Sequence, residues 1–130
     1  LGLMSGVPFI TKYKFQKDDT KETRILESVR VGGVFITRII IQPFAIVGNV
    51  YLKETNLVFF AQVGKVKTKF IKIDGTEEKE FEMCPNSGII HVPPNVAFAI
   101  ENIKSDKSVV VAFSDRPLHD QINDEPFQVL

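Results

Sequence analysis

The stretch that decides the fold runs from Met83 to Asn102 and reads MCPNSGIIHVPPNVAFAIEN. A turn over 85–88 leads into a short apolar segment, and a second apolar segment begins at Val96. Between the two segments stands Pro93-Pro94-Asn95. Proline cannot donate a ladder hydrogen bond, and asparagine tolerates the left-handed backbone region. The tripeptide therefore predicts a rigid corner between two strands, of the kind that small β-barrels need to close.

The composition is that of one globular domain. The chain has 130 residues, 44% of them hydrophobic and 25% charged, which is enough for a self-sufficient core and argues against disorder. A net charge of zero speaks against strong nonspecific attraction to nucleic acid or to an anionic membrane, although a local basic face stays open. Cys84 is the single cysteine and cannot form an internal disulfide, so we expect a reducing intracellular compartment. No apolar run reaches the ~20 residues of a membrane span, and we expect no membrane partner.

The two ends of the chain differ from the middle. The opening LGLMSG, residues 1–6, lacks the basic residues of a signal peptide, and we interpret it as a cloning remnant or a flexible leader. The missing natural start suggests a piece of a longer protein. We assign 7–114 to a single domain and 115–130 to a polar C-terminal tail, and whether this tail folds back stays open.

Strand patterns dominate the domain, and no segment carries a convincing 3.6-residue apolar period. Roughly ten short strands at 8–12-residue spacing predict an all-β sandwich or barrel. We read 16–22 as a charged loop. The expected strands are 7–15, 24–31, 34–42, 46–54, 57–63, 65–73, 77–83, 89–92, 96–103 and 108–114.

One predicted hairpin carries opposite charges on its two arms. Lysines alternate along 65–73 and glutamates along 77–83, and Asp74-Gly75 supplies the turn. We interpret the two combs as cross-strand charge pairs on a solvated face. The functional alternative is a basic groove for nucleic acid, whose field the acidic arm would cancel. Its residues would be Lys65, Lys67, Lys69 and Lys72.

The corner and its surroundings resemble the cupin family of small jelly-roll barrels. The second motif of that family combines a Gly, a Pro-x-Gly corner, a metal-binding His and an Asn, and the matching residues here are Gly88 (one residue off the usual spacing), Pro93, Asn95, Phe98 and Asn102. Its first motif, His-x-His, a Glu and a Gly, falls on Val50, Leu52, Leu57 and Gly64. The resemblance therefore implies a cupin jelly-roll barrel with extra N-terminal strands. Every position that would hold a metal is apolar.

Those substitutions argue against an enzyme. Divalent metals need imidazole, carboxylate or thiolate donors, and Val, Leu and Phe supply none, so we expect no metal, no cofactor and no catalytic residue. Of the two histidines, we expect a structural role for His91 and a solvated side chain for His119. Cys84 precedes a proline and has no adjacent basic residue to lower the pKa of its thiol, so we do not expect a nucleophile.

A closer resemblance covers roughly residues 34–114. The run from Asn56 to Val66, NLVFFAQVGKV, and the run from Gly88 to Asn102 are similar to the C-terminal cupin domain of the centromere and kinetochore protein family CENP-C, which lacks the metal histidines. The resemblance implies a homodimer in the nucleus, at the centromere of the chromosome, acting in cell division. It also implies centromere assembly factors as partners, such as a chaperone that deposits CENP-A. The family's basic nucleosome-binding motif is absent here, so DNA binding would belong to the full-length protein and not to this domain.

The strand patterns suggest two candidate surfaces. Several strands are apolar on both faces, which predicts an outward apolar patch that a two-fold dimer would cover. Alternatively, the N-terminal strands of the same chain cover it. We expect Val109, Val111 and Phe113 to face inward, and the dimer candidates are Phe35, Ile39, Ile41, Val58, Phe60, Val110 and Ala112. The second surface is the barrel mouth, either packed solid or open to a partner's side chain, lined by Val50, Leu52, Leu57, Phe98 and Ile100.

Two function classes thus compete, apart from the nucleic-acid alternative above. The favoured hypothesis is a non-enzymatic module that dimerises a centromere scaffold and recruits partners. The alternative is a bacterial-type cupin that modifies a sugar nucleotide or binds a small ligand.

Overall fold

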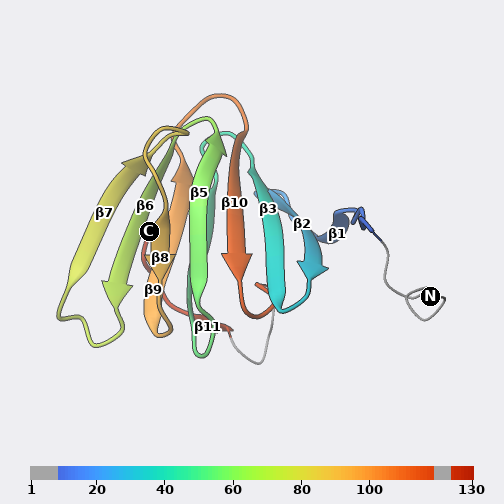
Figure 1. Ribbon diagram of the computed structural model, residues 1–130. Coiled ribbons are helices and arrows are strands. Elements are labelled where there is room, and N and C mark those ends of the chain that lie inside the picture. Colours follow the sequence, from blue (N-terminus) through green and yellow to red (C-terminus); the bar gives the residue numbers. More distant parts are fainter. Residues whose placement is uncertain (1–8, 119–123) are drawn as a thin grey trace.

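The computed structural model describes residues 9–118 and 124–130 and contains eleven β-strands in two antiparallel sheets (Figure 1). Sheet A has the order β1-β2-β3-β10-β5-β8 and sheet B the order β11-β4-β9-β6-β7. No helix in the described ranges is long and apolar enough to cross a membrane. The strands are β1 (Gln16–Thr20), β2 (Arg24–Val31), β3 (Val34–Ile41), β4 (Ile46–Leu52), β5 (Leu57–Val63), β6 (Val66–Lys72), β7 (Glu78–Met83), β8 (Ile90–Val92), β9 (Val96–Asn102), β10 (Ser108–Ser114) and β11 (Asp124–Pro126).

The two sheets pack face to face around one apolar core, and the predicted all-β jelly-roll architecture with extra N-terminal strands is confirmed. Side chains from the two sheets meet in this core. Phe59 of β5 in sheet A, for example, lies 6.2 Å from Phe70 of β6 in sheet B, measured between ring centroids. Burial of such side chains from both sheets is the main favourable term in holding the layers together.

The double-proline corner has the predicted form. It joins β8 of sheet A to β9 of sheet B, so it carries the chain from one layer to the other. Asn95 has a φ of 65°, in the left-handed region that asparagine tolerates. Its backbone N–H donates to the carbonyl oxygen of Leu52 at 2.8 Å, which ties the corner to the end of β4.

The N-terminal end of the chain differs from the sequence prediction, and the C-terminal end answers a question that the sequence left open. The segment expected to be a charged loop forms β1, which pairs with β2, whereas residues 9–15, expected to be a strand, form none. The predicted leader (1–6), residues 7 and 8, and His119 lie outside the described residues. Residues 124–130 fold back: β11 pairs with β4, and Val129 is buried. Both ends form strands because they pair with other segments of the chain, and local sequence patterns do not reveal such pairing.

A β-bulge changes the facing of β4. The sequence predicts Ile46, Gly48, Val50 and Leu52 on one face, but the register with β9 shifts between Gly48 and Val50. Gly48 has a φ of 95°, and a Cβ there would come within 2.9 Å of the Phe98 carbonyl oxygen. Ile46 therefore points outward while Val50 and Leu52 line the interior. Asn49, with a φ of 57°, accepts the backbone N–H groups of Val129 and Leu130 at 2.8 and 2.9 Å.

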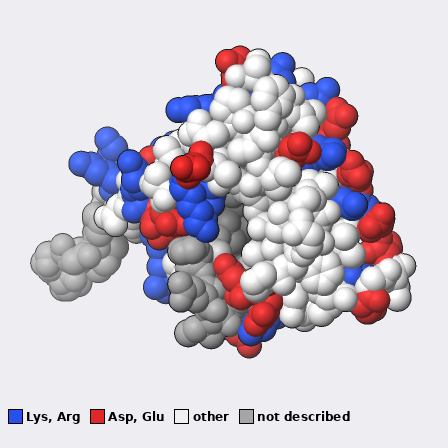
Figure 2. Space-filling model, turned by 180° about the vertical axis from the view of Figure 1, so that it is seen from behind, with Lys and Arg blue, Asp and Glu red and all other residues white. Residues whose placement is uncertain are grey.

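The charged hairpin pairs as predicted. β6 and β7 are antiparallel neighbours, and Figure 2 shows acidic and basic side chains alternating along one side of the molecule. Lys65 lies 3.0 Å from Glu82, and Lys67 lies 3.3 Å from Glu101 and 3.9 Å from Glu80. Lys72 pairs with Glu77 at 3.2 Å. These ion pairs engage Lys65, Lys67 and Lys72 of the predicted basic comb.

The facing of β3 and β10 is opposite to the prediction. Ile39 and Ile41 of β3, and Val110 and Ala112 of β10, are buried in the core between the sheets, so they are not available for a dimer interface. Phe35 shares their face of β3 and is half-buried. Both alternating sets on these strands are apolar, so alternation alone could not say which set faces the other sheet. The outward set on β10 is instead Val109, Val111 and Phe113.

One buried polar group ties together one end of the barrel. Asn102, fully buried, donates its side-chain N–H groups to the carbonyl oxygens of Ile41 (3.1 Å), Gln42 (3.1 Å) and Asp106 (2.8 Å). Its side-chain oxygen accepts the Lys104 backbone N–H at 3.0 Å and the Ser108 hydroxyl at 2.7 Å. The amide is therefore satisfied on all sides.

Replacement of Asn102 by leucine should be strongly destabilising. The change keeps the approximate volume but leaves three carbonyls, one N–H and one hydroxyl without their partner, and each buried unsatisfied group costs about 1–3 kcal/mol. We expect a loss of at least about 3 kcal/mol in the free energy of unfolding, and about 1 kcal/mol for Ser108→Ala. Urea unfolding followed by circular dichroism measures both.

The matched control is Asn86→Leu, at an exposed turn position. A loss for Asn102→Leu as small as that of the control would show that the network does not hold this end of the barrel.

Candidate functional site

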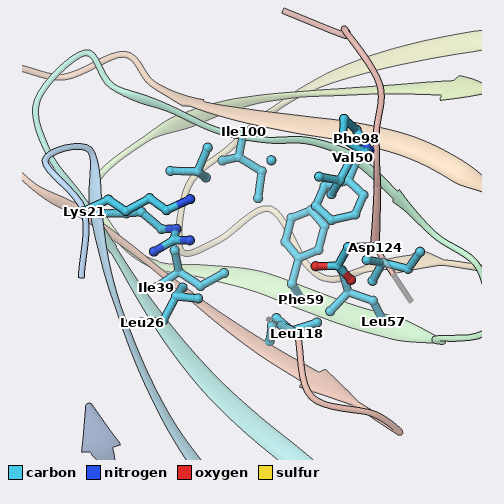
Figure 3. A pocket seen from close by; sticks show the side chains of 16 residues that line it. Lys21, Leu26, Ile39, Val50, Leu57, Phe59, Phe98, Ile100, Leu118 and Asp124 are labelled. Atoms are coloured by element: carbon cyan, nitrogen blue, oxygen red, sulfur yellow. The ribbon is translucent and has the colours of Figure 1, made fainter. Parts of the chain in front are cut away.

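A cavity of about 330 Å³ lies between the two sheets, inside the barrel (Figure 3). All five residues predicted for the barrel mouth line it, namely Val50, Leu52, Leu57, Phe98 and Ile100. They come from β4, β5 and β9, and Leu26, Ile39 and Phe59 add further apolar wall. The barrel is therefore open at this position and not packed solid.

Charged groups that the sequence analysis did not single out also line the cavity. Lys21 and Arg24 come from the turn between β1 and β2 and the start of β2, and Asp124 comes from β11. Arg24 pairs with Asp19 at 2.9 Å, with only 12% of the Arg24 side chain exposed. Lys21 falls in the predicted charged loop and Asp124 in the predicted tail, whereas Arg24 begins the predicted strand 24–31, and no periodic signal placed any of them at the barrel. Only the pairing of β1 with β2 and of β11 with β4 brings them to the cavity.

The cavity does not suit a divalent metal ion. The residues at the cupin metal positions, Val50, Leu52, Leu57 and Phe98, offer only carbon atoms to its interior. Among the described residues, no group of three or more His, Cys, Asp or Glu side chains could hold a metal ion. Since tight sites need several convergent donors, the residues present do not fit one.

The outer face of sheet A is the second candidate surface. Adjacent strands place apolar side chains opposite one another across it: Val29 faces Ile36, Ile36 faces Phe113, and Phe113 faces Val58. The rings of Phe60 and Phe113 stack with centroids 6.3 Å apart. Of the predicted dimer residues, Val58 and Phe60 lie on this face. We call it the sheet A outer face and define it by Ile25, Val29, Ile36, Ile40, Val58, Phe60, Val109, Val111 and Phe113.

One ion pair interrupts this apolar face. Arg38 pairs with Glu27 at 2.8 Å, and the Arg38 guanidinium lies 4.4 Å from the ring centroid of Phe15. β1 extends the edge of sheet A beside β2 (Figure 1), and the Phe15 ring, just before β1, packs on Arg38 of the outer face.

His91 lies at the edge of the same face. It points outward from β8, is exposed, and its Nε2 atom lies 3.2 Å from the side-chain oxygen of Asn56. Asn56 in turn donates its backbone N–H to Asp115 at 2.9 Å. These contacts link His91 of β8 and the β4–β5 loop to the end of β10, which fits the structural role expected for His91.

No family model and no curated protein matches the sequence. Solved structures match in fold. The capsular polysaccharide assembling protein CapF from Staphylococcus aureus superposes with a TM-score of 0.78 at 15% identity, over 95% of this chain and 34% of that one. An oxalate decarboxylase mutant from Bacillus subtilis superposes with a TM-score of 0.72 at 14% identity, over 85% of this chain and 30% of that one. Peruvianin-I, a cysteine peptidase from Thevetia peruviana latex, superposes with a TM-score of 0.63 at 13% identity, over 75% of this chain and 58% of that one.

These likenesses establish the fold, a cupin-type jelly roll. The chain spans about a third of the length of the CapF chain that it matches.

Cys84 has a different environment from the one predicted. The pairing of β6 with β7 brings Lys65 near it, and the Ser87 hydroxyl lies 3.4 Å from its sulfur. The hydrogen bond from Ser87 lowers the pKa of the Cys84 thiol most, and the Asn86 backbone N–H and the Lys65 charge lower it further. No basic residue is adjacent to Cys84 in the sequence, as noted above, and the cation that acts on the thiol comes instead from across the hairpin.

The lowered pKa predicts how alkylation of Cys84 depends on pH. Thiolate is the reactive form, so the midpoint of iodoacetamide modification should lie at lower pH in the folded chain than in the urea-unfolded chain. Ser87→Ala should move the folded midpoint upward, toward the unfolded value. Mass spectrometry of timed reactions measures both midpoints. Equal midpoints for the folded and unfolded chains would contradict this account of the Cys84 environment.

Proposed function

We propose that this chain is a non-enzymatic cupin module that associates with a second copy of itself through the sheet A outer face. The observation that carries the proposal is the continuous run of outward apolar side chains across β2, β3, β10 and β5. Soluble monomers rarely leave so many adjacent apolar side chains to water. A two-fold interface of standard size, about 800 Å² per subunit, would cover such a face.

The polar features of this face suit an interface between identical copies. The Glu27–Arg38 pair is satisfied within one chain, so its burial would leave no charge unpaired. The stacked Phe60 and Phe113 rings lie in adjacent strands near the middle of the sheet, where the anchors of an interface carry most of the binding energy.

The absence of catalysis belongs to the same proposal. The cupin metal positions hold Val, Leu and Phe, and β4 itself contributes no general base to the cavity wall. The carboxylate on this wall is Asp124 of β11, which pairs with Leu52. The apolar cavity walls favour binding over bond chemistry.

A role at the centromere, with a nuclear location and recruitment of assembly factors for CENP-A deposition, rests on the resemblance of residues 34–114 to the CENP-C cupin. We keep it as the cellular setting in which a dimerising module of this kind would work. Its test is co-purification of the full-length protein with centromeric chromatin.

A second candidate function is the binding of a small ligand inside the barrel. The open, mostly apolar cavity with charged groups at its ends favours it. CapF, a capsular polysaccharide assembling protein, and oxalate decarboxylase, an enzyme, share the fold, so small-molecule chemistry is a natural setting for this alternative. The two functions use different surfaces and are compatible with each other.

The dimer proposal predicts the mass in solution. Light scattering of the intact chain at micromolar concentration should give about twice 14.6 kDa. Phe60→Asp should give monomers, because it places a charge in the middle of the proposed interface, where an unpaired buried charge costs several kcal/mol.

Phe44→Asp is the matched control. Phe44 is 63% exposed and lies in the turn between β3 and β4, away from the sheet A outer face. A monomeric wild-type chain, or equal dissociation in both variants, would overturn the proposal.

A further inference from the structure

The cavity inside the barrel is apolar in the middle and charged at two places on its wall. Buried apolar side chains from both sheets form the middle, among them Leu26, Phe59, Phe98 and Ile100. Figure 3 shows Lys21 reaching into the cavity with its ammonium group, while the Asp124 carboxylate faces the cavity from the opposite side. A molecule in this space would contact carbon along most of its length and a charge at each end.

Lys21 is the cation available to a ligand. The charge of Arg24 is compensated by Asp19 at 2.9 Å. Lys21, by contrast, forms no ion pair with any residue of the described ranges 9–118 and 124–130. Its backbone is held in place, because its N–H donates to the Arg24 carbonyl oxygen at 2.9 Å and its own carbonyl oxygen accepts the Arg24 N–H at 3.3 Å. The turn therefore places Lys21, an exposed residue, at the edge of the cavity, with its ammonium group directed toward the apolar wall in Figure 3.

Lys21 and the apolar walls select for one orientation and one kind of ligand. An anionic head is attracted to Lys21, and a second ionised group between the sheets would lose water without a partner. The hydroxyl groups of a sugar ring there would also lose water without finding partners, at about 1–3 kcal/mol each. An apolar body would gain about 25 cal/mol for each Å² that it removes from water.

From these contacts we infer that the cavity binds a small amphipathic monocarboxylate, with its carboxylate on Lys21 and its apolar body between the sheets. A cavity of about 330 Å³ is at the lower end of the range of small-ligand pockets, about 300–1,000 Å³, so the ligand is small. This inference rests on the second candidate function and gives its ligand a chemical class. It excludes a nucleotide sugar as the occupant of the barrel.

Titration calorimetry of the intact chain with octanoate tests the inference, with octan-1-ol and UDP-glucose as the comparison probes. We expect one octanoate per chain, bound at least tenfold more tightly than octan-1-ol. Lys21→Gln should remove this tenfold preference and leave octan-1-ol binding unchanged. Lys107→Gln is the matched control, because it removes the same charge from an exposed position in the β9–β10 loop.

Val50→Phe locates the binding site. It fills part of the cavity from a half-buried position on β4 and should weaken octanoate binding at least tenfold, while circular dichroism reports an unchanged fold. Octanoate binding that Val50→Phe does not weaken would place the ligand elsewhere and overturn the inference.

The results distinguish the inferred ligand class from the small-ligand function on which it rests. If octan-1-ol or UDP-glucose binds as tightly as octanoate, and Val50→Phe blocks that binding, the barrel binds small ligands but the monocarboxylate class is wrong. If none of the three probes binds, both the class and the small-ligand function fail.

Discussion

The buried side chain of Asn102 is the interaction on which the barrel closure depends. Its amide joins the end of β3, through Ile41 and Gln42, to the loop that connects β9 and β10. Through Ser108 it also reaches the β5–β6 turn, where Ser108 accepts the Lys65 backbone N–H at 3.2 Å. Both sheets thus meet in one hydrogen-bonded cluster, whose desolvation cost is offset by its internal hydrogen bonds as long as every member is satisfied.

Gly64 makes room for this cluster. It has a φ of 86°, and a Cβ there would come within 2.2 Å of the Ser108 hydroxyl oxygen. A residue with a side chain would therefore clash with Ser108 at this position. Gly64 and Asn102 therefore serve one structural purpose, which is the closure of this end of the barrel.

With the barrel closed, the central strands of sheet A divide their apolar residues between two surfaces. The inward set of β3, β10 and β5 forms the core and part of the cavity wall, and the outward set forms the sheet A outer face. This division explains why a metal-free barrel could combine self-association with a ligand cavity. One surface lies outside the sheet and the other lies between the sheets, and the backbone of sheet A separates them.

Local chemistry in the sequence was sufficient to predict several features of this protein. The Pro93-Pro94-Asn95 corner, the paired charges of the β6–β7 hairpin and the inward facing of Val50 and Leu52 follow from backbone preferences, cross-strand pairing and alternation. The tertiary structure alone decided which apolar set of β3 and β10 faces the core, because both sets are apolar and only the opposite sheet distinguishes them. It also decided that Lys21 and Asp124 meet the cavity and that Lys65 acts on Cys84, since strand pairing between distant segments creates these contacts.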